Sequence, residues 1–144
     1  MLSNTSKYAI RAAIYLALNT RNDEKIGIRK ISSDLGIPSP FLAKILQVLA
    51  KRKLLASTKG PNGGFCLAKE SKKITLYDIV TVIDGNDIFH KCLISMRTCN
   101  EDLTPCPLHV SYEPIRNQVI KLFREQTIDD LAHDMKTTDR IIAL

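Results

Sequence analysis

The sequence lacks any long uncharged apolar run, and this absence argues against a membrane-spanning helix. None of its apolar stretches approaches the roughly 18 residues that a span requires, although 44% of the 144 residues are hydrophobic. The most apolar N-terminal stretch, YAIRAAIYLALN, contains Arg11 and is followed by no small-residue cleavage site. We therefore interpret it as a core helix rather than a signal peptide, and we expect a cytoplasmic protein of about one domain.

Patterns of the common enzyme classes are also missing. No glycine-rich phosphate-binding loop opens a helix, and no paired Ser/His/Asp arrangement supplies an activated nucleophile. The stretch KGPNGG fits a hairpin turn instead of a nucleotide cradle. We therefore do not expect an enzyme.

Charge is divided unevenly along the chain. Residues 1–75 carry 14 basic against 4 acidic residues, which is +10, and residues 76–144 carry 7 against 11, which is −4; the two sum to the net charge of +6. A basic half is typical of a part that binds a polyanion. The acidic half suggests a separate regulatory or assembly part.

The basic half has the periodicity of two helices joined by a tight turn. A first core helix is predicted over about 6–18, and a short helix over 28–35 precedes the turn GIPS. Ser39 and Pro40 are predicted to be the N-cap and first-turn residues of the next helix. This order predicts a helix-turn-helix, in which the second helix has a polar outer face.

Two strand-like runs, LLAST and FCLAK, follow that helix and are separated by KGPNGG. A helix-turn-helix followed by a β-hairpin is a winged helix, so the predicted fold class is mainly α with a small β-hairpin and a long C-terminal dimerisation helix. Lys59 and Gly60 at the wing tip are expected to approach phosphates or a minor groove. Cys66 on the second strand is interpreted as a small hydrophobic residue.

The acidic half contains a short helix at 74–84, capped by Thr75, and an amphipathic helix at 114–126. Pro114 either lies in the first turn or marks a kink, if the helix begins near Pro107. The stripe on this helix has no obvious partner within the chain, so we expect a second copy to cover it; the stripe consists of Ile115, Val119, Leu122 and Phe123.

These elements predict four segments. Residues 1–84 form a winged-helix DNA-binding domain, and 85–110 form a cysteine cluster-binding loop. Residues 111–134 form the dimerisation helix and its cap, and 135–144 form a flexible tail.

The stretch CLISMRTCNEDLTPCPLH, residues 92–109, gathers three of the four cysteines and ends in a histidine. Six residues separate each cysteine from the next. In a reducing compartment, clustered thiols indicate a metal or redox site more often than a structural disulfide. An iron–sulfur cluster, a zinc ion and a thiol–disulfide switch all remain open at this point, and His109 has the alternative of being a surface residue at a helix start.

Four parts of the sequence together resemble the Rrf-two family of winged-helix transcription regulators, of the IscR and NsrR type. They are SKYAIRAAIYLAL, KISSDLGIPSPFLAKILQVLAKRKLLASTKGPNGGFCLA, the loop ending in PCPLH, and TIDDLA. The resemblance implies a homodimer on a palindromic double-stranded DNA operator that senses iron–sulfur status, redox state or nitric oxide. It also implies an iron–sulfur cluster, taken as 2Fe–2S, on Cys92, Cys99, Cys106 and His109, with zinc as the alternative.

The chain also departs from that family's pattern. Its loop cysteines are more widely spaced, Lys7 and Tyr8 stand where some members have an acidic residue, and Ala43 and Lys44 replace a frequent Glu-Gln pair. We therefore infer no operator sequence from the resemblance. The residues predicted to contact DNA are Ser39, Pro40, Phe41, Lys44, Gln47, Lys51, Lys59 and Gly60.

A zinc-dependent RNA-binding module is the contrasting hypothesis for the cysteine loop. Such a module needs basic and aromatic residues around its metal to stack on bases. Residues 92–109 offer Arg97 against Glu101 and Asp102, and no aromatic residue. We therefore favour the transcription regulator.

Overall fold

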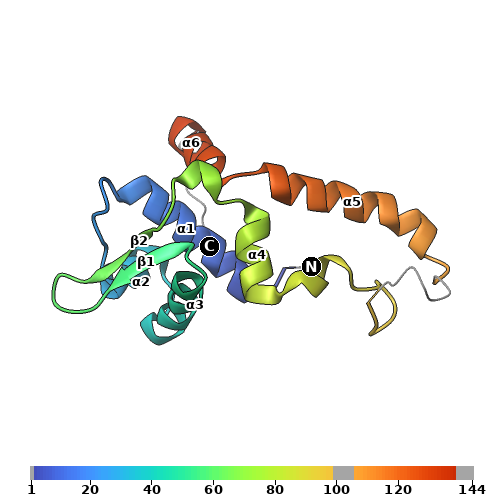
Figure 1. The fold of residues 1–144 in the computed structure, drawn as a ribbon, viewed down its shortest axis with the longest axis horizontal. Coiled ribbons are helices and arrows are strands. Elements are labelled where there is room, and N and C mark those ends of the chain that lie inside the picture. Colours follow the sequence, from blue (N-terminus) through green and yellow to red (C-terminus); the bar gives the residue numbers. More distant parts are fainter. Residues whose placement is uncertain (1, 99–105, 139–144) are drawn as a thin grey trace.

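A computed structural model describes residues 2–98 and 106–138. They form six α-helices, two short 3₁₀ helices and a two-stranded antiparallel sheet (Figure 1). The elements are α1 (Asn4–Asn19), α2 (Ile28–Leu35), α3 (Ser39–Lys51), β1 (Leu55–Thr58), β2 (Gly64–Leu67), η1 (Ser71–Lys73), α4 (Leu76–Asp84), η2 (Asn86–Phe89), α5 (His109–Glu125) and α6 (Ile128–Thr138). The predicted fold class, mainly α with a small hairpin, is confirmed.

Helix α1 lies at the centre of the hydrophobic core. Its buried face is built largely from small side chains, which let neighbouring helices approach closely; its buried residues are Ser6, Ala9, Ala12, Ala13, Ile14 and Leu16. Helices α2, α3, α4 and α6 and strand β2 all pack against it. The segment predicted as a core helix is therefore the centre of the fold.

Polar contacts tie the start of α1 to the end of α4. The hydroxyl groups of Ser3 and Ser6 donate hydrogen bonds to the Asp84 carboxylate at 2.5 and 2.7 Å. Burial alone would raise the pKa of Asp84, but these hydrogen bonds outweigh it and leave the pKa lowered. The carboxylate is thus held ionised between the two helices.

Backbone hydrogen bonds fix the base of the wing, the hairpin of β1 and β2, to the rest of the structure. Strands β1 and β2 pair from Leu55–Leu67 to Thr58–Gly64, and Ile26 bridges to Phe65 through backbone hydrogen bonds of 2.9 and 3.0 Å. Phe65 and Cys66 are buried, and burial raises the pKa of the Cys66 thiol. The residues between the strands are left to extend from this fixed base.

Helix α5 projects away from the other helices, whereas α6 returns to them (Figure 1). The Ile128 N–H donates to the Ile74 carbonyl at 2.9 Å, and Ile128 and Ala132 join the core against α1. Segments far apart in sequence therefore complete the body that carries the wing. No described helix is long and apolar enough to cross a membrane.

Three expectations about local structure are resolved by the structure. Ser39 is not the N-cap of α3: the Pro38 carbonyl accepts the first helical hydrogen bond from Leu42, which makes Pro38 the cap. Thr75 does cap α4, within a capping box with Asp78. Pro114 lies inside α5, which begins at His109. This is the predicted alternative in which the helix starts before the proline.

The boundary of the predicted tail is wrong at its start. Helix α6 continues to Thr138, because its apolar face packs on α1 and extends the helical segment. Residues 135–138 are therefore helical, and 139–144 lie outside the described residues.

We predict that Gly64→Ala displaces the wing and destabilises the fold. A Cβ atom at this position would lie 2.2 Å from the Ile26 carbonyl oxygen, and the backbone φ is +152°. Thermal or urea unfolding should show a loss of at least about 1 kcal/mol beyond that of Gly60→Ala. Gly60 is the matched control, since its φ is +106° but a Cβ would meet no atom within 4 Å. Equal losses for the two variants would contradict the close packing at Ile26.

Candidate functional site

The α2–turn–α3 unit presents one face of α3 to solvent. Buried residues on the inner face hold α3 against α1 and α4, namely Leu42, Ile45, Leu46 and Leu49. Lys44, Gln47 and Lys51 are exposed on the opposite face. This geometry is that of a helix-turn-helix whose second helix is free to enter a DNA major groove.

A groove of about 490 Å³ separates α3 from the wing. It is lined by Gln47, Ala50, Lys51, Ser57, Thr58, Lys59 and Phe65. The structure therefore brings three predicted DNA residues, Gln47, Lys51 and Lys59, to one concave surface. Ser57 and Thr58 were not among the predicted residues, although two consecutive hydroxyl side chains directly before a lysine at the wing tip were a visible signal in the sequence.

The other predicted DNA residues surround this surface without lining the groove. Pro40 and Lys44 are exposed on α3, Ser39 is half-buried, and Gly60 is exposed in the wing turn. Phe41 is 39% exposed, but its ring also packs edge-on against Tyr8 at 5.6 Å between centroids. Phe41 thus helps to fix α3 on α1 in addition to any contact with a ligand.

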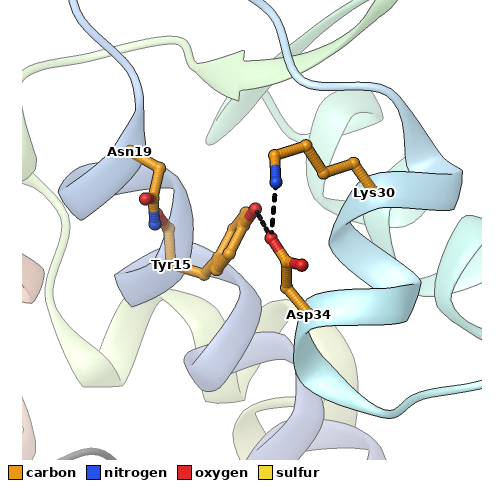
Figure 2. A network of polar contacts seen from close by, with 4 residues as sticks. All are labelled: Tyr15, Asn19, Lys30 and Asp34. Carbon is orange, nitrogen blue, oxygen red and sulfur yellow. Dashed lines mark hydrogen bonds and ion pairs between the residues drawn. The ribbon is translucent and has the colours of Figure 1, made fainter.

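A polar network fixes α2 on α1 (Figure 2). The Tyr15 hydroxyl donates to the Asp34 carboxylate at 2.5 Å, and the Lys30 ammonium contacts the same oxygen at 3.0 Å. Asn19 donates to the Tyr15 carbonyl one turn further along α1. Burial and the contact with Asp34 raise the pKa of Tyr15 to about 12. The network orients the first helix of the DNA-binding unit.

Two of the loop cysteines lie together at the far end of α5. The Sγ atoms of Cys92 and Cys106 are 3.5 Å apart, and both residues are half-buried. The Cys92 N–H donates to the Arg97 carbonyl at 3.1 Å, and the His109 N–H donates to the Cys106 carbonyl at 2.9 Å. Residues separated by fourteen positions are thus brought into sulfur–sulfur contact.

The thiol pair fits a tetrahedral metal ion. With metal–sulfur bonds of about 2.3 Å, two thiolates on one ion lie about 3.8 Å apart, close to the observed 3.5 Å. Cys99 lies outside the described residues. His109 begins α5, and its Nε2 atom is 3.5 Å from the Glu113 carboxylate. Within the described parts of the chain, no three His, Cys, Asp or Glu side chains gather as a metal site.

Arg116 links the cysteine loop to α5, and sequence analysis did not single it out. Its guanidinium is buried, donates to the Lys91 carbonyl at 3.2 Å and lies 4.9 Å over the Tyr112 ring. The acceptor is the residue directly before Cys92. The sequence shows only an arginine within the amphipathic segment, and arginine at such a position is usually exposed, so neither its burial nor its acceptor was predictable.

The opposite end of α5 is anchored to α4 and η2 by aromatic contacts. Phe89 stacks on Tyr77 at 5.1 Å and meets Phe123 edge-on at 5.5 Å. The Arg124 guanidinium lies 4.6 Å over the Tyr77 ring. Phe123 therefore faces the body of its own chain, which corrects the expectation that the whole stripe lacks an intrachain partner.

Comparisons with known proteins agree with this geometry. The chain matches the Rrf2 family, described as "Iron-dependent Transcriptional regulator", over residues 2–134. It is 39% identical over 132 residues to a "Putative HTH-type transcriptional regulator" of Aquifex aeolicus (strain VF5), covering 91% of this chain and 90% of that protein.

Two solved structures share the fold. One is CymR, the global cysteine regulator of B. subtilis, with 25% identity, a TM-score of 0.75, and coverage of 92% of this chain and 96% of that chain. The other is T. potens IscR, with 21% identity, a TM-score of 0.76, and coverage of 99% and 93%. At 21% identity the second likeness shows the fold alone.

The fold and the family match define a winged-helix transcriptional regulator. The chain belongs to the Rrf2 family, the Rrf-two family that its sequence resembles. The expectation that it is not an enzyme is confirmed, since the family and the Aquifex relative are transcriptional regulators.

We predict a pH-dependent role for Asp34 in fixing α2. Hydrogen bonds from Tyr15 and then Lys30 hold the pKa of Asp34 below its ordinary value. A lowered folded-state pKa stabilises the fold above the unfolded-state pKa, and this contribution is lost as pH falls through the folded-state pKa. Asp34→Asn should therefore lower the melting temperature at pH 7, and the difference from wild type should shrink below about pH 3. The exposed Asp87→Asn is the control; a difference that persists unchanged in acid would contradict the assignment.

Proposed function

We propose that this Rrf2-family regulator binds a two-fold DNA site as a homodimer and that its cysteine loop holds a metal centre, preferably an iron–sulfur cluster. The observation that carries the proposal is the 3.5 Å distance between the Sγ atoms of Cys92 and Cys106. These two residues lie at the end of α5 that is far from the winged-helix body. Such a position lets the state of the loop act on the spacing of two recognition helices. The protein would act in the cytoplasm, where it would sense iron–sulfur status, redox state or nitric oxide.

The DNA-binding role is supported by the charge and shape of the α3–wing surface. Lys44 and Lys51 are exposed on α3, and Lys51 and Lys59 line the groove between α3 and the wing. Lysine ammonium groups neutralise phosphates and so position a protein on a duplex. We assign Ser39, Pro40 and Phe41 to the end of α3 that enters the major groove first, and Gly60 to the wing tip beside the phosphates.

Dimerisation is supported by the exposed side of α5. Leu108, Ile115 and Leu122 recur at seven-residue intervals and are 38%, 55% and 54% exposed. A seven-residue repeat places apolar side chains along one seam of a helix pair. A second copy of α5 would bury this seam, while Phe123 remains against its own Phe89. We thus keep 111–134 as the dimerisation segment, with the correction that α6 packs on α1.

The metal centre is supported by the donor chemistry of the loop. Thiolates are soft ligands that suit iron–sulfur clusters and zinc. We propose Cys92, Cys99, Cys106 and His109 as the ligand set, in which the structure describes three residues and shows sulfur contact for two. A bound cluster would supply a redox-active group. Zinc is the second candidate, because the sulfur–sulfur distance suits a single tetrahedral ion equally well.

The path from the loop to the DNA-binding body runs through α5. Arg116 fixes the Lys91 carbonyl, so a shift of Cys92 acts on α5 close to the proposed dimer seam. The aromatic cluster of Tyr77, Phe89 and Phe123 then joins α5 to α4, which packs on α3. Each step is a direct contact between packed side chains or backbone atoms.

We predict that Lys51→Ala and Lys59→Ala each weaken binding to DNA sites selected from a random duplex library. Each variant should lower affinity several-fold at all sequences and reduce the salt-dependence slope by about 1, because each removes one phosphate contact. Fluorescence anisotropy at several salt concentrations measures both. Lys72→Ala, an exposed lysine on η1, is the control and should change neither. Equal effects at Lys72 would show that net charge alone decides binding.

We predict that Ile115→Asp converts a dimer into a monomer. A carboxylate in the apolar seam would be buried without compensation, so the dimer dissociation constant should rise at least about tenfold. Sedimentation equilibrium measures this directly. Asn117→Asp adds the same charge at an exposed position of α5 that faces away from the seam and should leave assembly unchanged. A wild-type protein that is monomeric at all concentrations would contradict the dimer.

We predict that protein purified without oxygen carries iron and inorganic sulfide and absorbs visible light. Cys92→Ala and Cys106→Ala should each abolish the colour, since each removes a thiolate ligand. Cys66→Ala is the matched control and should retain it, because Cys66 lies in the wing strand. Stoichiometric zinc in a colourless protein would establish the second candidate, and the absence of both metals would overturn the metal centre.

A further inference from the structure

We propose that Cys92 and Cys106 form an intramolecular disulfide when the metal-free protein meets a peroxide, and that this bond blocks metal binding until a dithiol reduces it. The inference rests on the proposed function only for its effect on metal. The pairing itself rests on the geometry of the loop. The inference selects one pair of the three loop cysteines as the site of modification.

The distance between the two sulfur atoms favours this pairing. The two Sγ atoms are 3.5 Å apart, and a disulfide bond is about 2.05 Å long. The atoms must therefore approach by only about 1.5 Å. Sulfur atoms already in van der Waals contact are thus a short movement away from bonding distance.

The segment that carries Cys92 is a small exposed turn. Its N–H bonds to the Arg97 carbonyl and Lys91 bridges to Thr98, so residues 91–98 form a small closed turn. Side chains within this turn are exposed, Ile94 at 67% and Met96 at 104%. Because its described side chains from Leu93 to Arg97 are exposed, the turn can adjust toward Cys106, just before α5, while the Arg116 bond to the Lys91 carbonyl holds its base.

Cys66 lies in very different surroundings from the loop cysteines. That thiol is 3% exposed in the wing strand, paired in register with Ala56. Burial raises the pKa of Cys66, so its reactive thiolate form is disfavoured. A peroxide should therefore spare Cys66 while it oxidises the loop.

The chemistry balances with hydrogen peroxide as the two-electron oxidant. One cysteine attacks a peroxide oxygen, the O–O bond breaks, and a sulfenic acid and water form. The second thiol then attacks the sulfenic sulfur, and its proton leaves with the hydroxyl group as a second water. Two thiols and one peroxide thus give one disulfide and two water molecules.

The disulfide and a metal centre would use the same two sulfur atoms and so exclude each other. A thiolate is the form that binds metal, and a disulfide sulfur offers no such charge. Oxidation would therefore hold the loop in a metal-free state. Thiol–disulfide exchange with a dithiol would release it.

Peptide mapping of the full-length protein tests the pairing. The protein is stripped of metal with a chelator without oxygen, treated with hydrogen peroxide, alkylated and digested with trypsin and a glutamate-specific protease. Cleavage after Lys91, Arg97, Glu101 and Arg116 places the three cysteines in separate peptides, 92–97, 98–101 and 102–116. The expected product joins 92–97 to 102–116 and is two hydrogens lighter than the separate peptides.

Cysteine variants test which two sulfur atoms form the disulfide. Cys99→Ser should form the same cross-link at a rate within about twofold of wild type, because neither reacting sulfur is changed. Cys92→Ser and Cys106→Ser should each abolish it, and Cys66 should be alkylated as in untreated protein. A main cross-link that includes peptide 98–101, or one between two chains, would overturn the proposal.

Zinc uptake provides a second readout. The oxidised protein should bind no zinc, and dithiothreitol should restore the uptake of the reduced protein. Undiminished zinc uptake by fully cross-linked protein would overturn the proposed exclusion. Reduced protein that binds no metal would instead contradict the metal centre, while the peptide map would still decide the pairing.

Discussion

The buried face of α1 is the contact on which the rest of the structure depends. Its alanines allow α2, α3, α4 and α6 to approach closely around one helix. A larger side chain at Ala9 or Ala12 would push these neighbours apart, since a close-packed interior has no spare volume. The position of the recognition helix α3 is therefore set by its packing against α1, on the side opposite to its exposed face.

Helix α5, which projects from the winged-helix body, is stabilised differently from that body. Helix α5 has one buried guanidinium, Arg116, and an aromatic contact at Phe123, and much of its remaining apolar surface is exposed. Its orientation thus depends on a few contacts at each end rather than on a continuous core. An element held in this way can respond to a small local change, because few interactions oppose its movement.

Sequence periodicity predicted the local elements well and the long-range contacts poorly. The bounds of α2 and the capping role of Thr75 follow from short-range rules, and the structure reproduces both. The cap of α3 was misassigned because Ser39 follows a proline whose carbonyl already accepts the first helical bond. The return of α6 to α1, and the contact of Arg116 with Lys91, join residues too distant for any periodicity to connect.

The candidate site likewise contains residues that the sequence predicts and contacts that only the fold reveals. Outward residues of α3 follow from helical spacing, so Lys44, Gln47 and Lys51 were predictable, whereas the groove shared with Ser57 and Thr58 required the fold. The cysteines were identified by composition and spacing, but only the fold shows Cys92 and Cys106 in contact. The placement of Cys99 lies outside the described residues, and its assignment stays a prediction.

The return of α6 has a consequence for the order in which the chain can fold during synthesis. Ile128 and Ala132 fill the core beside α1, so the DNA-reading body is incomplete until the ribosome has released residues beyond 132. The loop cysteines emerge before that moment. A nascent chain would therefore expose its loop thiols to the cell while the winged-helix body is still unfinished.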